Sequence, residues 1–484
     1  MVDAVGLTII ITTAIIFSLI GILYTKGKKI SVEDFISARG SVKLTTAVAT
    51  LVASTLGVWI LFSPAESAIT GGITALIGYA LGSAAALFVF AWIGLRIRKL
   101  MPKGHTITEY VFHRYGKGMY MLVLLIAVFY MVVFLAAELT GISLAAKIVF
   151  DIPLVFTAVI VGIGTLAYTA FGGLKASIFT DRVQSIVILP LLAIIFLTSL
   201  FFLGGFENVI DKADKINPNL FDFSYFSGIE FALTLIIAII GAELFNQGNW
   251  QRVYAAKNNL VMLKSFLIAG LIVLPIIFFI GFFGFFAVGS GTVEHPSIAM
   301  FEFLLEVTPK WILLTAMVLG IALVMSSMDT LLNGLVSLFT IDLARLKPKL
   351  SHKSLLSIGK WFTVILAGLA ILVSTKGYSV LYLFLVADLV CVGAAFPVFY
   401  GMYKRRFSGA SALMASVIGV AVGASIFPNP SFTSGIFFPT YFSLFWSFLT
   451  ALISSTILSI IFGFYSKKFD FEILKKKVSV LGRY

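Results

Sequence analysis

The stretch LTTAVATLVASTLGVWILFSPAESAI, residues 44–69, decides the fold of this 484-residue chain. It is long and apolar enough to cross a bilayer as a helix, which takes about 20 residues. Its centre, residues 53–57, nevertheless collects small and hydroxylated side chains and a glycine, and Pro64 and Glu66 follow. A helix broken at such a point exposes backbone carbonyl groups inside the membrane, where they can bind ions and polar solutes. The alternative is that the small side chains only let two helices pack closely.

Twelve further stretches of similar length and hydropathy fill most of the remaining chain. The composition, 60% hydrophobic and 12% charged, lies far from the roughly 25% charged residues of soluble domains. In a bilayer such stretches are stable only as helices, because every backbone group must be hydrogen-bonded internally. We therefore predict an all-α integral membrane protein with thirteen transmembrane helices. The predicted spans are 5–24, 44–69, 73–95, 119–146, 153–171, 183–204, 229–245, 260–288, 311–338, 355–373, 380–402, 410–427 and 442–464.

The positive charge of the chain is distributed unevenly between the two sides of these spans. Of the 35 lysines and arginines, 30 fall in loops on one side. This pattern predicts a multi-pass protein of the cell membrane, with the N-terminus outside and the C-terminus in the cytoplasm. It also argues against nucleic acid as the partner of the net +13 charge, and it leaves membrane lipid as the surface partner. The run Lys475–Lys477 either sets this topology or contacts anionic lipid.

A second interrupted span covers residues 229–245. It carries Glu243 and runs directly into Asn246 and Gln247. A carboxylate inside a membrane usually faces a partner or a water-filled cavity, so we take these three residues as candidate solute contacts. The alternative is that Glu243 lies at the membrane boundary and pairs with Arg252 or Lys257.

The two interrupted spans are five apart in chain order, which is the spacing that two inverted five-helix repeats would produce. We predict a LeuT-like transporter core with the first repeat at 44–225 and the inverted second repeat at 226–407. Residues 1–43 then form an extra helix and the first cytoplasmic loop. Residues 408–484 form two peripheral helices and a basic cytoplasmic tail.

A third polar group lies within the ninth span, where Ser326, Ser327 and Asp329 interrupt an apolar run. Helical spacing places Ser326 and Asp329 on one face. Sodium is a small, hard cation that should take oxygen ligands, as calcium and magnesium do. The two hydroxyls, with carbonyls freed by a break at 53–56, would supply such a set. The alternative is that both serines bond back to their own helix or only pack.

Several separate segments resemble the sodium/solute symporter family. The most specific is YTAFGGLKAS at 168–177 followed by TDRVQ at 180–184, which is similar to the family's Gly-Gly-Leu-Lys-Ala loop and Thr-Asp-x-x-Gln helix start. NQGNWQRVYAAK at 246–257 and MSSMDTLL at 325–332, with Asp342, also resemble family signatures. The likeness extends from about Asp34 to Lys404.

This resemblance implies a sodium site and a position on the sodium exit path. The site would consist of the backbone carbonyls of Ala53, Leu56 and Leu323 and the hydroxyls of Ser326 and Ser327. Asp181 matches the family position on the path that sodium takes toward the cytoplasm.

Near the ion segment, Trp59 matches members of the proline type, whereas Thr55 stands where those members carry a carboxylate. Both are candidate solute contacts, and the departure at Thr55 argues against proline.

The expected function is therefore sodium-coupled import of a small organic solute by alternating access. An amino acid or a carboxylate is favoured over a sugar, urea or a vitamin. Proton coupling through Glu243, Asp329 or Asp388 and a non-transporting membrane sensor are the alternatives. We expect no enzyme activity and no cofactor besides the co-transported sodium ion. The four histidines fall in predicted loops and none has the His-Glu-x-x-His spacing of a metalloprotease.

Overall fold

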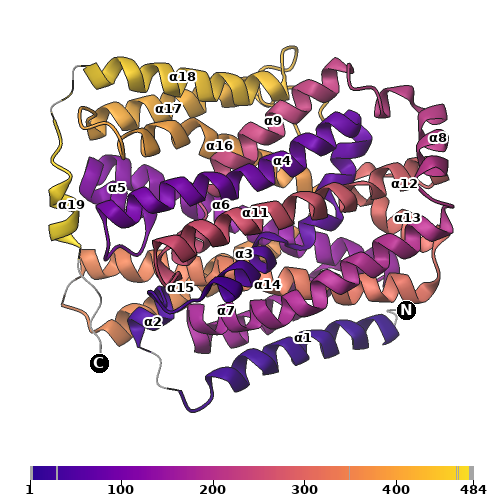
Figure 1. The fold of residues 1–484 in the computed structure, drawn as a ribbon, viewed down its shortest axis with the longest axis horizontal. Coiled ribbons are helices and arrows are strands. Elements are labelled where there is room, and N and C mark those ends of the chain that lie inside the picture. Colours follow the sequence, from indigo (N-terminus) through magenta and orange to yellow (C-terminus); the bar gives the residue numbers. More distant parts are fainter. Residues whose placement is uncertain (1–3, 29–30, 348, 465, 467, 479–484) are drawn as a thin grey trace.

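The computed structural model describes residues 4–28, 31–347, 349–464, 466 and 468–478, and these form a bundle of α-helices joined by short loops (Figure 1). The helices are α1 (Ala4–Thr25), α2 (Val32–Ile36), α3 (Leu44–Thr55), η1 (Val58–Leu61), α4 (Ser63–Leu100), α5 (Ile107–Tyr115), α6 (Lys117–Phe150), α7 (Leu154–Phe202), α8 (Phe206–Ile216), η2 (Pro218–Leu220), α9 (Phe226–Glu243), α10 (Gln247–Ala255), α11 (Asn259–Gly281), α12 (Phe283–Ser290), η3 (Pro296–Ile298), α13 (Ala299–Val307), α14 (Lys310–Leu346), α15 (His352–Ser374), α16 (Val380–Tyr400), α17 (Gly409–Ser425), α18 (Leu444–Phe464) and α19 (Glu472–Lys477).

Within the described residues, ten helical segments are long and apolar enough to cross a membrane. Three shorter apolar helices, Leu44–Thr55, Leu154–Ala170 and Gly409–Ser425, coincide with the predicted spans at 44–69, 153–171 and 410–427. The all-helical membrane architecture is thus confirmed. The count of thirteen spans and the inverted repeat remain predictions.

Two of the long helices contain a sharp kink at a glycine. Gly72 in α4 has φ 67° and Gly173 in α7 has φ 55°, a region that is essentially restricted to glycine. A Cβ atom at Gly72 would lie 2.7 Å from the carbonyl oxygen of Leu220. Each kink separates two of the predicted spans, so the long helices α4 and α7 each contain two straight segments.

The first interrupted span breaks at the position that its sequence indicates. Helix α3 ends at Thr55, Leu56 and Gly57 are extended, and the short η1 precedes the start of α4 at Ser63. In a continuous helix the amide of Gly57 would bond to the carbonyl of Ala53, but here it donates to the carbonyl of Thr55 at 3.2 Å. The amide of Ile60 likewise donates to Gly57, at 3.2 Å, and not to Leu56. The carbonyls of Ala53 and Leu56 thereby lose their helical donors.

The second interrupted span is followed by a buried half-helix. Helix α9 ends at Glu243, and the apolar helix Phe226–Glu243 agrees with the predicted span at 229–245. After a short turn the polar run continues as α10. The side chain of Asn246 caps this half-helix by accepting a hydrogen bond of 3.0 Å from the amide of Gly248. All nine residues of α10 are buried, and the polar side chains among them find hydrogen-bond partners inside the bundle.

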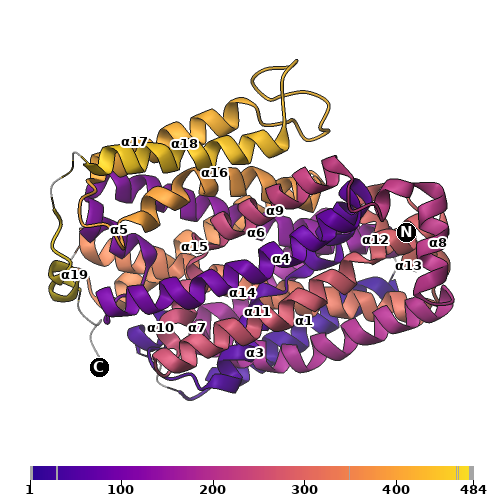
Figure 2. The same cartoon turned by 45° about the horizontal axis from the view of Figure 1, so that its top comes forward.

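The two interrupted spans are joined by backbone hydrogen bonds where α3 begins and α10 ends. The amide of Val42 donates to Ala255 at 3.0 Å, and the amide of Lys257 donates back to Val42 at 2.9 Å. In Figure 2 the start of α3 and α10 lie near one another at the same end of the bundle. The two hydrogen bonds thus fix the start of α3 to the chain at the end of α10.

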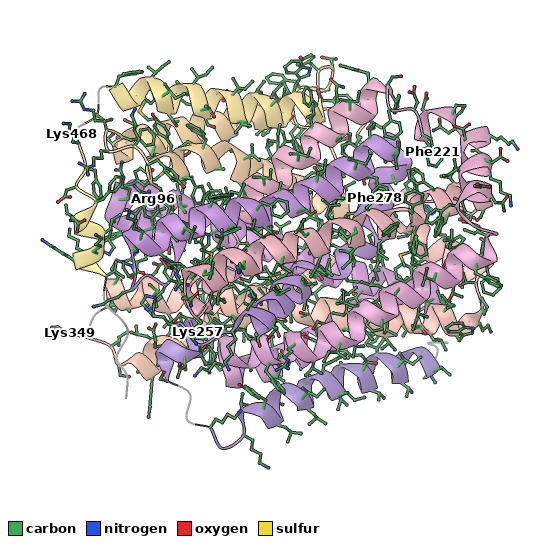
Figure 3. The ribbon with its side chains drawn as sticks, viewed as in Figure 1. Arg96, Phe221, Lys257, Phe278, Lys349 and Lys468 are labelled. Carbon is green, nitrogen blue, oxygen red and sulfur yellow. The ribbon has the colours of Figure 1, made fainter. Side chains whose placement is uncertain are left out.

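Basic residues gather at one end of the bundle. In Figure 3, Arg96, Lys257, Lys349 and Lys468 lie toward the end that holds α2, α5 and α19, while Phe221 lies toward the opposite end. Helix α1 begins at that opposite end (Figure 1). This arrangement agrees with the charge asymmetry of the sequence. The end with the basic residues is called the basic end below.

Candidate functional site

A cavity of about 40 Å³ lies where the two interrupted spans meet α6 and α16. This volume holds one or two water-sized groups. The two half-helix breaks border it, and both aromatic and carboxylate side chains reach it. It is lined by Thr55, Trp59, Tyr79, Ser83, Ala86, Leu87, Tyr130, Phe134, Ile239, Ala242, Glu243, Asn249, Phe384 and Asp388.

Aromatic rings form much of the cavity wall. Trp59 stacks on Tyr79, with ring centroids 5.5 Å apart, and Phe384 meets Trp59 edge-on at 6.1 Å. Phe134 in turn packs edge-to-face on Phe384 at 4.8 Å. These rings come from η1, α4, α6 and α16, so the cavity is assembled by helices far apart in the sequence.

Two carboxylates line the same cavity, and their surroundings differ. Glu243 accepts hydrogen bonds from the Tyr130 hydroxyl at 2.9 Å and from the Asn249 amide at 2.7 Å. Asp388 is only 5% exposed, lies on α16, and makes no hydrogen bond or ion pair with any residue that the structure describes. Neither carboxylate has a cationic partner among the described residues.

Three of the five predicted solute contacts, Thr55, Trp59 and Glu243, line this cavity. Asn246 does not line it but donates a hydrogen bond of 3.2 Å to Glu243. Gln247 points away from it, because its amide nitrogen donates to the carbonyl of His105 at 2.9 Å. Gln247 therefore neither lines the cavity nor forms a hydrogen bond with a residue that lines it.

The five predicted sodium ligands are all buried at the junction of the first break with α14. Ser326 donates to Asp181 Oδ1 at 2.6 Å, and Ser327 donates to Glu138 Oε2 at 2.7 Å. Because each hydroxyl gives its proton to a carboxylate, its lone pairs are available to a cation. The carbonyls of Ala53 and Leu56 lack their helical donors, as described above. This donor set, made of oxygen atoms only, fits sodium.

Glu138 on α6 connects the first break to the serine pair, a role that sequence reasoning missed. The same oxygen that accepts from Ser327 also accepts from the amide of Val58, at 2.9 Å. Its other oxygen, Oε1, is buried without a hydrogen-bond partner. An isolated carboxylate within an apolar span was the available signal, since such residues usually serve a site.

Asp181 on α7 joins the serine pair to the second interrupted span. Its Oδ2 accepts from Thr50 on α3 and forms an ion pair of 2.8 Å with Arg252 on α10. The side chains of Asp181 and Arg252 are 0% and 2% exposed. Arg252 thus pairs with Asp181 and not with Glu243. The alternative that Glu243 pairs with Arg252 is therefore wrong. Ser326 and α10 share a single carboxylate.

Asp329, one turn below Ser326, faces α7 as well. It accepts hydrogen bonds from Ser177 at 2.6 Å and from Tyr168 at 2.8 Å. Ser326 and Asp329 therefore do lie on one face of α14, and both are held by α7. Asp329 is not among the residues that line the cavity.

An ionic cluster at the basic end joins α2 and α5 with the loops that carry Arg39 and His105. His105 lies 2.8 Å from Glu33 and 3.4 Å from Glu109, and Arg39 pairs with Glu33 at 2.9 Å. Burial by itself would lower the pKa of His105, but hydrogen bonds and charges from Glu109 and Glu33 outweigh burial and raise this pKa to about 9. Burial by itself would raise the pKa of Glu33. The hydrogen bond from His105 and the charges of His105 and Arg39 outweigh burial and lower this pKa to about 2.

We expect this cluster to make the protein less stable as pH rises. A group whose pKa is raised by folding stabilises the protein fully below its unfolded pKa, about 6.5 for histidine. That contribution is lost as pH rises through the folded pKa of about 9. Thermal unfolding of wild type and His105→Gln between pH 6 and 9.5 should show the wild-type advantage shrinking toward high pH. Parallel pH profiles for the two proteins would contradict the expectation.

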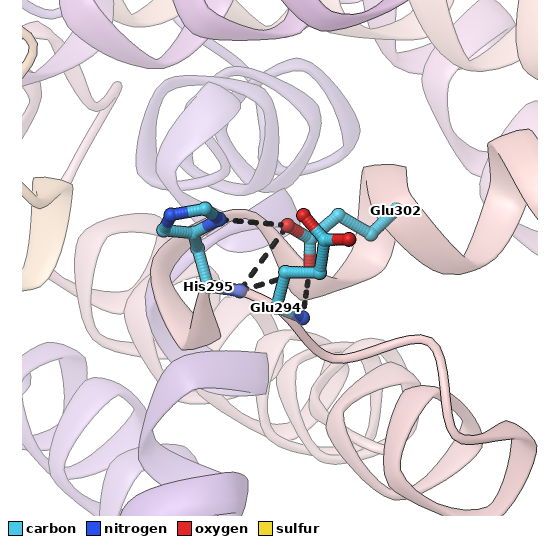
Figure 4. A group of neighbouring side chains, drawn as sticks. All are labelled: Glu294, His295 and Glu302. Atoms are coloured by element: carbon cyan, nitrogen blue, oxygen red, sulfur yellow. Dashed lines mark hydrogen bonds and ion pairs between the residues drawn. The ribbon is translucent and has the colours of Figure 1, made fainter.

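A group of possible metal ligands outside the bundle core, Glu294, His295 and Glu302, is accounted for by its own hydrogen bonds (Figure 4). Glu302 accepts from the backbone amides of Glu294 and His295 at 3.0 to 3.2 Å and from the His295 ring at 3.2 Å. These contacts anchor the loop before α13. Glu294 and His295 are exposed. The hydrogen bonds of this group hold the loop in place and do not indicate a metal centre.

The family model described as "Sodium:solute symporter family" matches residues 35–419 of the chain. A Candida albicans protein named "Spermidine transporter DUR31" is 27% identical over 84% of this chain and 77% of its own length. The "Urea active transporter" of Saccharomyces cerevisiae is 22% identical over 81% of this chain and 58% of its own length. A bovine "Sodium/mannose cotransporter" is 24% identical over 72% of this chain and 66% of its own length. The chain thus spans little more than half of the yeast relative.

Two solved structures share the fold at low sequence identity. A sodium-coupled sialic acid symporter in a substrate-bound, outward-open state has a TM-score of 0.76 and 19% identity, covering 96% of this chain and 98% of its own. A nucleobase-cation-symport-1 family transporter in a closed conformation has a TM-score of 0.55 and 14% identity, covering 89% and 94%. These neighbours confirm a LeuT-like transporter fold at the level of overall architecture.

Proposed function

Because this chain belongs to the sodium:solute symporter family, we propose that it imports a small organic solute across the cell membrane, driven by sodium and by alternating access. Membership of a transporter family implies a solute and a sodium ion as the two substrates, and it argues against an enzyme. The basic end would then face the cytoplasm. Each sodium ion entering across 100 mV would release about 2.3 kcal/mol, enough for roughly fiftyfold accumulation of solute.

The freed carbonyls of Ala53 and Leu56 carry this proposal. The Ala53 carbonyl lies in the last turn of α3 and the Leu56 carbonyl in the break that follows. Glu138 accepts from both Val58, just beyond that break, and Ser327. A cation bound there would join η1 to α14 and neutralise part of the charge of Glu138 and Asp181. Sodium would thus favour the conformer in which these helices are close together, which is what ion coupling requires.

A continuous set of contacts connects this ion site with the cavity. Ser326 bonds to Asp181, Asp181 pairs with Arg252 on α10, and Asn249 on the same half-helix donates to Glu243 in the cavity wall. In our proposal, loss of sodium frees Asp181 to hold Arg252 more tightly and shifts α10. The contact of Asn249 with Glu243 in the solute site would then depend on whether sodium is bound.

The relatives are named for solutes as different as urea, spermidine and mannose. They support a small polar solute in the cavity, whose aromatic rings and few polar groups are typical of ligand sites. The cavity has no cationic residue among the described residues that line it. This lining argues against a carboxylate, which is one of the two solute classes that the sequence favours.

Uptake into proteoliposomes tests sodium coupling against the proton alternative. With external sodium replaced by potassium at constant pH, uptake should fall at least tenfold. A proton gradient imposed without sodium should not restore it. Undiminished uptake in potassium would reject sodium coupling and would favour protonation of Asp388, the unpaired carboxylate of the cavity.

A further inference from the structure

From the cavity geometry we propose that the transported solute is an organic cation with at least one protonated amine. This inference rests on the proposed transport function, because it assigns the central cavity to the solute. It specifies the charge of the solute, which neither the family nor the fold determines.

The first support is an excess of acidic over basic side chains among the described residues of the cavity wall. Glu243 receives hydrogen bonds only from uncharged donors among the described residues, namely Tyr130, Asn246 and Asn249. Asp388 receives none, although it is 5% exposed and lines the same cavity. Buried charges in proteins are nearly always paired, and within a membrane an unpaired carboxylate is especially costly. A solute ammonium group would supply the missing partner for Asp388.

The second support is the aromatic wall. Trp59, Tyr79 and Phe384 form one continuous aromatic cluster beside the carboxylates. Faces of such rings attract cations, and rings arranged around a cavity are a common means of binding ammonium groups. A sugar or a carboxylate would use neither the charge excess nor this attraction. A carboxylate solute would also add a third negative charge to the cavity.

The third support is the position of a further carboxylate. Glu66 on α4 is 9% exposed, and the hydroxyl of Ser379, just before α16, donates to both of its oxygens at 2.8 to 2.9 Å. It lies near the predicted outer end of both spans, while Asp388 lies about two turns further along α16. Carboxylates at both levels would attract a cation that approaches Asp388 from the outer end.

The test uses purified wild-type protein in sodium and a panel of probes: putrescine, spermidine, urea, mannose and lactate. The amines should raise the unfolding temperature and compete with one another, since they bind only the folded state. Urea, mannose and lactate should do neither. The same amines should enter proteoliposomes down a sodium gradient. Absence of stabilisation by any amine would overturn the inference.

Variants identify the carboxylate involved. Asp388→Asn should weaken amine binding at least tenfold, whereas Asp388→Glu, which keeps the charge, should retain much of it. Glu207→Gln removes an exposed carboxylate on α8 and should change nothing. If Asp388→Asn is unstable, Phe384→Leu should still lower amine affinity severalfold by removing one ring. Unchanged amine affinity in both Asp388→Asn and Phe384→Leu would contradict the assignment.

Two results separate this inference from the proposed function. Sodium-driven uptake of urea or mannose without inhibition by amines would reject the cationic solute and leave sodium-coupled transport standing. Amine binding that depends on Asp388 but not on sodium would support the cationic solute and reject sodium coupling.

Discussion

Replacing Ser326 and Ser327 together by alanine should abolish sodium-stimulated uptake. Both hydroxyls are buried, and they provide two of the five oxygen ligands proposed for sodium. Losing two ligands to a charged partner removes about 3 kcal/mol of binding free energy, which is roughly a hundredfold in sodium affinity. Uptake as a function of sodium concentration, measured in proteoliposomes, gives this shift directly.

Ser337→Ala is the matched control for the serine pair. Ser337 is buried on the same helix, and its hydroxyl has no hydrogen-bond partner among the described residues. Its removal should leave sodium dependence unchanged. If the double variant at 326 and 327 also kept its sodium stimulation, the ligands would have to be sought elsewhere.

Removing the charge of Arg252 should strongly destabilise the protein. Arg252→Met leaves Asp181 buried at 0% exposure without its cationic partner. Breaking a buried ion pair from one side usually costs about 3 to 5 kcal/mol, because the remaining charge has no compensation. The unfolding temperature of the purified variant should therefore fall by several degrees, and sodium should restore part of the loss if it can approach Asp181.

A double-mutant cycle distinguishes the pair from simple packing. Asp181→Asn combined with Arg252→Met removes both charges and should be more stable than Arg252→Met alone. If the two losses were merely additive, the ion pair would have no energetic role, and the proposed connection from Ser326 to α10 would lose its central contact.

The break in the first interrupted span could be predicted because its cause is local. Ser54, Thr55 and Gly57 are weaker helix formers than the apolar residues around them, and α3 does end at Thr55. The serine pair was likewise visible as two hydroxyls in an apolar run. The course of α10 could not be predicted, because Gln247 and Arg252 are polar residues whose burial depends on distant partners.

The composition of the cavity also depends on tertiary contacts. Trp59, Glu243 and Asp388 were noted individually in the sequence, but only the packing of α9 and α16 against η1 brings them to one cavity. Glu138 was not predicted, because α6 is unbroken at that position and nothing nearby in the sequence indicates its partners Val58 and Ser327. As a carboxylate inside an apolar span it nevertheless carried a signal of a functional role.

Direct binding of radioactive sodium to the purified protein tests the proposed ion site most simply, since it requires no knowledge of the solute. Wild type should bind sodium saturably, and potassium should not compete. The Ser326→Ala, Ser327→Ala variant should show no saturable binding in the same concentration range, while Ser337→Ala should match wild type. Equal sodium binding by the double variant and wild type would contradict a cation held between the break after α3 and the two serines of α14.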